Sequence, residues 1–187
     1  MSTIPVLPLW QPWASLVAIG AKTIETRSKP TKVRGRIAIH ACVTRKGFPI
    51  EPRNNGEFVI GDYVVELWRQ VGARMRRDGV ITPMPFGAIV ATANLVDCVP
   101  INPDDEFRGR DAVFRYTEGH ALRSIRGAVP IDVTDQLPYG DFTSGRWAWI
   151  LEDITPVNPP IPHKGSQGWG RIDTKALPSL AAERADP

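Results

Sequence analysis

The sequence predicts an α+β fold, a small mixed β-barrel with one or two helices across its openings. The chain of 187 residues is long enough for one domain with a substantial core, and 42% of its residues are hydrophobic. Its 16 glycines and 18 prolines favour many turns and short strands over long helices. Closing short strands into a barrel removes exposed edges, which makes this architecture the expected one. We expect one domain over residues 1–174 and a poorly ordered tail over residues 175–187.

The N-terminal segment predicts a short strand followed by a helix. Residues 6–10 are mostly apolar and favour the strand. Pro12 suits the first turn of a helix, where its missing N–H group is no loss. Apolar residues at positions 13, 16 and 17 then have helical spacing, and Gly20 is expected to end the helix.

The next segment, residues 23–27, predicts a strand with one apolar and one polar face. It contains β-branched residues, and Ile24 alternates with Glu25 and Arg27. The i, i+2 spacing puts Glu25 and Arg27 on one side of the strand, about 7 Å apart at their Cα atoms. We therefore expect these two side chains to form a hydrogen-bonded pair.

Residues 35–41 predict a second strand of the same kind. Ile37 and Ile39 face one way, while Arg36 and His40 face the other. Polar groups of the two strands could thus converge on one cleft. Polar-out alternation is also normal for a solvated sheet face, and on the residue pattern alone that interpretation comes first.

Beyond residue 41, clear patterns predict one helix and two strands, and one long segment gives only weak signals. Apolar residues at helical spacing, with Asp62 as a cap, predict a helix over residues 62–77. Residues 87–99 are apolar on both faces and predict a buried central strand. Residues 102–144 are polar and rich in turn-forming residues, with only weak signals. Residues 145–151 predict a strand on which two tryptophans share one face.

Positive charge is concentrated in one part of the chain. The net charge is only +3, but residues 22–53 hold nine basic and two acidic residues, a net charge of +7 that leaves −4 elsewhere. Such a segment predicts a positive face that binds an anionic polymer, although a solvated loop has the same composition.

Several kinds of site are disfavoured by the sequence. Cys42 and Cys98 lie in apolar contexts without partners at metal-ligand spacing, which predicts free thiols in a reducing, cytoplasmic compartment. The three histidines are scattered, so we expect no metal and no cofactor. No apolar run is long enough for a membrane span, and we see no signal peptide. Neither a nucleophilic triad motif nor a phosphate-binding glycine loop is present.

Several segments, taken together and in order, resemble the ASCH domain family of the PUA-like superfold. The first three are WQPWA at residues 10–14, GAKTIETR at 20–27 and GRIAIHA at 35–41. Matching segments follow at residues 87–98, 139–151 and 160–169. The resemblance implies the PUA-like barrel. It leaves function open, because ASCH-type domains include nucleic-acid binders and at least one group of hydrolases.

The resemblance and the strand pattern together predict a cleft around Lys22 and Glu25, closed by the C-terminal motif. Its expected ligand-binding residues are Gln11, Trp13, Lys22, Glu25, Arg27, Arg36, His40, Lys164, Gln167 and Trp169. If the chain is an enzyme, the expected catalytic residues are Lys22, Glu25 and His40.

Binding of nucleic acid, RNA in the first place, is the leading functional hypothesis. Lysine and arginine would hold phosphates, and Trp169 or Trp13 would stack on an unpaired base, although Trp13 also fits the core. Glu25 or Gln11 would recognise a base edge, since a carboxylate accepts a hydrogen bond from an exocyclic amine.

The alternatives are two hydrolases and an interaction module without catalysis. One ASCH-like group of amidohydrolases acts on acylated cytidine and uses the lysine that matches Lys22. Glu25 replaces that group's threonine, and Val90 or Ala91 stands where its carboxylate is expected. An RNA-cleaving enzyme with Lys22, Glu25 and His40 as acid and base is the second hydrolase hypothesis. The oligomeric state stays open.

Lys22 follows Gly20 and Ala21 at the point where helix gives way to strand. We expect its ammonium to face the cleft and contact a phosphate or carbonyl of the ligand. On this hypothesis Lys22→Ala weakens binding without unfolding the protein, because no core volume is lost.

Overall fold

The fold is described by a computed structural model. It describes residues 2–43, 50–52, 58–60, 85–101, 113–116, 119–123, 130–143 and 145–177. The helix predicted over residues 62–77 lies outside these ranges. So do three cations of the basic segment: Arg45, Lys46 and Arg53.

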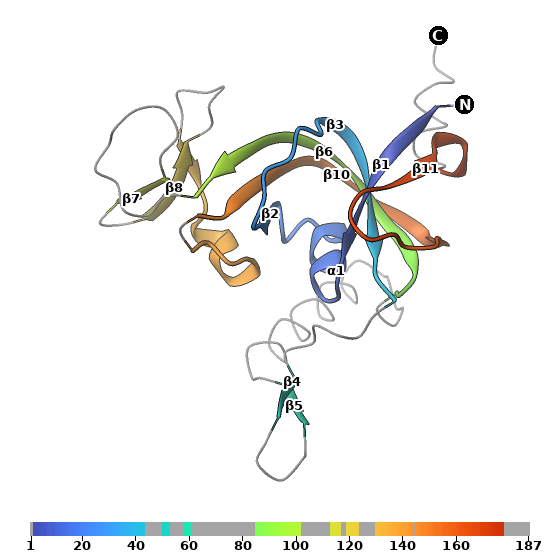
Figure 1. The fold of residues 1–187 in the computed structure, drawn as a ribbon, viewed down its shortest axis with the longest axis horizontal. Helices are drawn as coiled ribbons and strands as arrows, with labels where there is room; N and C mark the ends of the chain where they lie inside the picture. Colours follow the sequence, from blue (N-terminus) through green and yellow to red (C-terminus); the bar gives the residue numbers. More distant parts are fainter. Residues whose placement is uncertain are drawn as a thin grey trace. The chain divides into compact units, whose positions relative to one another are not determined.

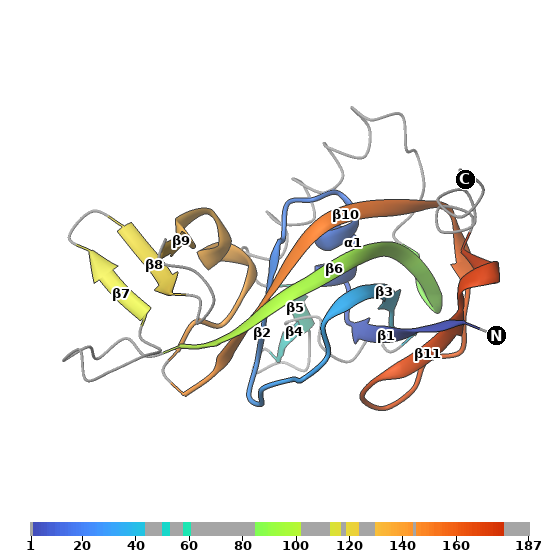
Figure 2. The same ribbon diagram turned by 90° about the horizontal axis from the view of Figure 1, so that it is seen from above.

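Six strands form one mixed sheet in the order β11-β1-β3-β6-β10-β2 (Figures 1 and 2). They are β1 (Thr3–Leu9), β2 (Ile24–Arg27), β3 (Gly35–Ala41), β6 (Ala88–Pro100), β10 (Trp147–Pro162) and β11 (Gly170–Asp173). β1 pairs parallel to β3 and antiparallel to β11, and β10 pairs antiparallel to β2. The α+β class is confirmed. Within the described residues β2 and β11 end the sheet without pairing to each other, so closure into a barrel stays a prediction.

The chain divides into two compact units, and β3, β6 and β10 contribute residues to both. The first unit comprises residues 1–21, 37–92 and 154–187, and the second comprises residues 22–36 and 93–153. Whether residues 1–174 form one domain stays a prediction.

In the first unit, helix α1 (Trp13–Ala18) lies where the sequence predicts it. Pro12 precedes it, and the Leu16 N–H donates to the Pro12 carbonyl at 2.9 Å. Gly20 adopts φ +70°, a left-handed conformation that ends a helix at little cost to glycine. The predictions for the start and the end of this helix are confirmed.

Strand β3 has the predicted bounds but not a solvated face. Ala38 and His40 are buried on the side expected to be polar, and Ile37 and Ile39 are buried as well. Ala38 packs in the core cluster of the first unit, which also holds Val6, Ile89, Val157, Ile172 and Leu177. The interpretation of this side as solvated is therefore wrong. A strand between two neighbours can be covered on both sides.

The first unit also contains shorter elements. β4 (Ile50–Pro52) pairs with β5 (Phe58–Ile60), and a short 3-10 helix, η2 (Thr174–Ala176), follows β11. Leu177, the last residue that the structure describes, is fully buried, and a poorly ordered tail over residues 175–187 stays a prediction. Residues 178–187 lie outside the described residues.

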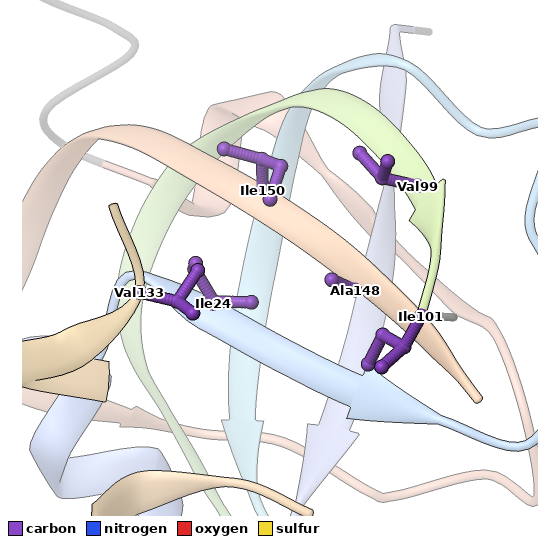
Figure 3. Close-up of a cluster of buried hydrophobic side chains, with 6 residues drawn as sticks. All are labelled: Ile24, Val99, Ile101, Val133, Ala148 and Ile150. Atoms are coloured by element: carbon purple, nitrogen blue, oxygen red, sulfur yellow. The ribbon is translucent and has the colours of Figure 1, made fainter. Parts of the chain in front are cut away.

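The second unit has its own hydrophobic cluster, drawn in Figure 3. Its six residues are Ile24 from β2, Val99 from β6, Ile101 directly after β6, Ala148 and Ile150 from β10, and Val133. The prediction of β6 as a buried strand is confirmed, since most of its residues are buried.

Residues 102–144, for which the sequence gives weak signals, contain further strands. β7 (Val113–Tyr116), β8 (Gly119–Arg123) and β9 (Pro130–Asp132) form an antiparallel sheet. A 3-10 helix, η1 (Thr134–Tyr139), follows them. Among the described residues, no helix has the length and apolar character needed to cross a membrane.

Candidate functional site

Strand β2 carries Glu25 and Arg27 on the face opposite the hydrophobic cluster of the second unit. Ile24 is opposite Ile150 in the sheet and packs in the cluster, while Glu25 is opposite Trp149. Successive side chains of a strand point to opposite faces, so Glu25 and Arg27 share the face that Ile24 does not use. The predicted register of this strand is confirmed.

Glu25 stands between two cations. Arg27 Nε lies 2.8 Å from Glu25 Oε1, and Lys22 Nζ lies 3.2 Å from Glu25 Oε2. Glu25 and Arg27 form an ion pair, which confirms that the two side chains meet on one face; that they are also hydrogen-bonded stays a prediction. Only 11% of the Glu25 side chain is exposed, so this carboxylate is held in a restricted orientation.

Lys22 is fully buried, with 0% of its side chain exposed. Its ammonium also donates to the carbonyls of Ile24 and Tyr139, each at 2.6 Å. Burial is the main cause that lowers the pKa of Lys22, and the charge of Arg27 adds to it; Glu25 acts in the opposite direction.

These contacts change what is expected of Lys22. Because its side chain is part of the core, the expectation that Lys22→Ala removes no core volume is wrong. Contact between the ammonium and a ligand stays a prediction, and it requires the ammonium to exchange one of its present partners.

Lys22, Glu25 and Arg27 form a charged cluster, and an aromatic ring lies near its exposed end at Arg27. The Arg27 guanidinium carbon lies 5.8 Å from the centroid of a Trp149 ring, within the range of a cation–π interaction. Trp149 is buried, and its indole N–H donates to the Lys29 carbonyl at 3.3 Å. Arg27 is therefore restrained by Glu25 on one side and by Trp149 on another, while 37% of its side chain stays exposed.

The described part of the basic segment continues beyond Arg27. Lys29 and Lys32 are exposed. Arg34 pairs with Asp97 at 3.4 Å, and Arg36 donates to the Asp153 carbonyl at 3.1 Å. Within the described part of this segment, Lys29 and Lys32 are therefore the exposed lysines, and Arg27 keeps 37% of its side chain exposed beside its ion pair with Glu25.

Two predicted residues of the first unit, Gln11 and Trp13, lie at the start of α1. Gln11 is buried; its amide donates to the Pro85 carbonyl at 2.7 Å and accepts from the Ser15 N–H at 3.1 Å. These bonds tie the start of the helix to residue 85. Trp13 is half-buried.

His40 is buried beneath the segment that follows β10. Its Nε2 lies 3.0 Å from the His163 carbonyl oxygen, and the two imidazole rings meet edge to face at 5.6 Å. A Cβ on Gly165 would lie 2.8 Å from His40 Cε1, so the backbone passes directly over the ring. Burial lowers the pKa of His40, opposed by the His163 carbonyl.

The other three predicted residues of the first unit follow in this segment. Lys164 and Gln167 are exposed, and Trp169 is half-buried. The predicted site residues thus form two groups. Lys22, Glu25, Arg27 and Arg36 belong to the second unit; Gln11, Trp13, His40, Lys164, Gln167 and Trp169 belong to the first. Convergence of the two groups on one cleft stays a prediction.

Two residues that contact the Lys22–Glu25–Arg27 cluster were not predicted to do so: Tyr139, which accepts from Lys22, and Trp149, whose ring lies near Arg27. A third residue that was not predicted, Gln136, accepts from the backbone N–H groups of Thr23 and Ile24, between Lys22 and Glu25. The alternation of residues 145–151 puts Trp149 on a defined face, but no local pattern indicates its partner across the sheet. Gln136 and Tyr139 lie more than one hundred residues from Lys22, in a region with weak signals.

The described residues give no support to a metal site or a disulfide. No group of three or more His, Cys, Asp and Glu side chains there could hold a metal ion. Cys42 and Cys98 are free thiols, and Cys98 is buried.

A family model, the ASCH domain, matches residues 7–136 of the chain. The chain belongs to the ASCH domain family. This confirms the resemblance seen in the sequence motifs, and the ASCH family is in general one of RNA-binding, PUA-like domains. No curated protein matches the chain.

Solved structures of the ASCH protein from Zymomonas mobilis are similar to this chain. A Tyr-to-Phe variant shares 18% sequence identity at a TM-score of 0.43, and the match covers 95% of this chain and 96% of that one. The unsubstituted protein shares 16% identity at the same TM-score, over 96% of this chain and 93% of that one.

Proposed function

We propose that this ASCH domain binds single-stranded RNA through the face of β2 that carries Glu25 and Arg27, together with the basic residues that follow. The observation that carries the proposal is a carboxylate fixed by two cations beside an exposed basic segment. Arg27, Lys29 and Lys32 supply charge for phosphates. Glu25 supplies an acceptor that recognises a base bearing an exocyclic amine.

An unpaired strand fits this arrangement better than a duplex. A carboxylate on a strand face reaches a base edge most easily when the base is turned away from a helix. Of the two side chains predicted to recognise a base, Glu25 is the stronger candidate, because it is the less deeply buried of the two, with 8% of the residue exposed against 1% for Gln11.

Fluorescence anisotropy with labelled single-stranded RNA over a range of salt concentrations tests the proposal. Two exposed cations are removed together in Lys29→Gln/Lys32→Gln. If each contacts a phosphate, the slope of log K against log salt becomes shallower by about 1.4, at about 0.7 per contact with a single strand. Lys175→Gln is the matched control, because Lys175 is an exposed lysine of the first unit. Binding that is absent, or that is insensitive to salt, would refute the proposal.

Hydrolysis of an acylated cytidine, or of single-stranded RNA, is the second candidate function. It is favoured by a buried lysine of lowered pKa beside a carboxylate, a pair of groups suited to proton transfer. Incubation of the protein with each substrate, followed by chromatography, tests this function. Turnover by the parent that Glu25→Gln abolishes would support it. Absence of turnover on both substrates would leave binding alone.

A further inference from the structure

Among the residues that the structure describes, side chains rather than another strand bond to the open edge of β2. β2 is the last strand of the sheet, and Ile24 uses its two backbone polar groups on protein partners away from β10. Its N–H donates to Gln136 Oε1 at 3.3 Å, and its carbonyl accepts from Lys22 Nζ at 2.6 Å. The Thr23 N–H donates to the same Gln136 oxygen at 2.8 Å. Helix η1 is thereby fixed to the start of β2.

A second contact joins η1 to the charged cluster. The Tyr139 carbonyl, at the end of η1, accepts from Lys22 Nζ at 2.6 Å. The same ammonium lies 3.2 Å from Glu25 Oε2. The position of the Glu25 carboxylate thus depends on η1 through Lys22, and the buried ammonium acts as the link between them.

The chain after η1 stays close to β2. The Asp141 N–H donates to Thr26 Oγ1 at 2.9 Å, and a Cβ on Gly140 would lie 3.0 Å from Thr26 Cγ2. Residues 136–141 therefore follow β2 along its length. Their contacts begin at Gln136, whose buried amide oxygen holds two successive N–H groups.

We infer that Gln136 is a positioning residue of the RNA site, which sets its preference for bases with an exocyclic amine by holding η1, Lys22 and Glu25 in register. This inference rests on the proposed function. Gln136 contacts no ligand; it acts through the backbone of β2 and through the carbonyl of Tyr139. Two of the three proposed phosphate-binding cations, Lys29 and Lys32, lie outside this chain of contacts, and the third, Arg27, is also held by Trp149. Base preference and charge attraction should therefore separate on mutation.

The test compares three variants on single-stranded oligocytidine and oligouridine, whose bases have the same ring size. Gln136→Met removes the acceptor oxygen and keeps a side chain of similar length. Gln136→Glu keeps an acceptor at the same reach. Asp135→Asn, at an exposed neighbour on η1, is the matched control.

We expect the parent to bind oligocytidine roughly tenfold more tightly than oligouridine, as one good base contact provides. Gln136→Met should bring this ratio close to one with an unchanged salt slope, Gln136→Glu should restore the preference at least partly, and Asp135→Asn should leave the ratio as it is. Hydrogen exchange of the Ile24 amide should quicken in Gln136→Met and slow again in Gln136→Glu.

Each other outcome overturns the inference in a recognisable way. If Gln136→Met keeps the parent's ratio, Gln136 does not position Glu25. If the ratio and the salt slope fall together, its role is merely structural. If the parent binds both oligomers equally, the basic surface stands but Glu25 recognises no base. If the parent binds neither, the proposed function itself fails.

Discussion

Replacing Lys22 by methionine is expected to destabilise the fold even though it keeps most of the side-chain volume. The substitution removes the donor from two carbonyl oxygens, those of Ile24 and Tyr139, and takes one of two cations from Glu25. Arg27 remains beside the carboxylate at 2.8 Å. Removing one partner of a buried, hydrogen-bonded ion pair costs about 3–5 kcal/mol. We expect the lower end, about 3 kcal/mol, because Arg27 stays and the ammonium is no longer buried.

The companion variant Lys22→Ala separates packing from hydrogen bonding. It loses the same donor and also leaves a cavity where the aliphatic stem lies, so it should cost about 2 kcal/mol more than the methionine variant. Urea unfolding of the three proteins at neutral pH measures both differences. Unfolding free energies within about 1 kcal/mol of the parent for Lys22→Met would show that the buried ammonium contributes little, and would refute this reasoning.

The same pair of proteins gives a pH dependence of known sign. Burial lowers the pKa of Lys22 in the folded protein below its ordinary value of 10.5. At a pH between this lowered pKa and 10.5, the unfolded chain therefore binds more protons than the folded protein. Raising the pH towards 10.5 should therefore stabilise the parent relative to Lys22→Met, which lacks this group. A difference in unfolding free energy that shrinks or stays constant over this range would contradict the burial argument.

Three further predictions concern the first unit. Gly165→Ala should lower the unfolding free energy by about 1–3 kcal/mol, because its methyl would stand 2.8 Å from His40 Cε1; equal urea midpoints for this variant and the exposed-site control Ser166→Ala would contradict the close approach. An NMR titration should place the pKa of His40 below 6.5, since burial disfavours the imidazolium, and stability should fall as the pH drops below 6.5; a midpoint at or above 6.5 would be inconsistent with burial. Gln11→Leu should cost about 0.5–2 kcal/mol, the range for losing a side-chain hydrogen bond at the start of a helix, because Gln11 accepts from the Ser15 N–H; an unchanged melting temperature by circular dichroism would argue against a stabilising role of this bond.

Local patterns in the sequence determine much of the fold. Proline and glycine bound α1, since one fits a first helical turn and the other adopts positive φ. Alternation fixes which face of β2 carries Glu25 and Arg27, because the period of a strand leaves no other choice. The ordered motifs also identify the family, which the family model confirms over residues 7–136.

What the sequence could not determine is which polar side chains are covered. Lys22 and His40 are polar residues that the sequence pattern places on a solvent-facing side, yet both are buried. His40 is covered by a segment 123 residues away along the chain, and Lys22 bonds to a carbonyl 117 residues away. No periodicity links such distant positions. Only the tertiary structure brings η1 to the edge of β2, where a buried ammonium is stable because nearby carbonyls and a carboxylate accept its hydrogen bonds.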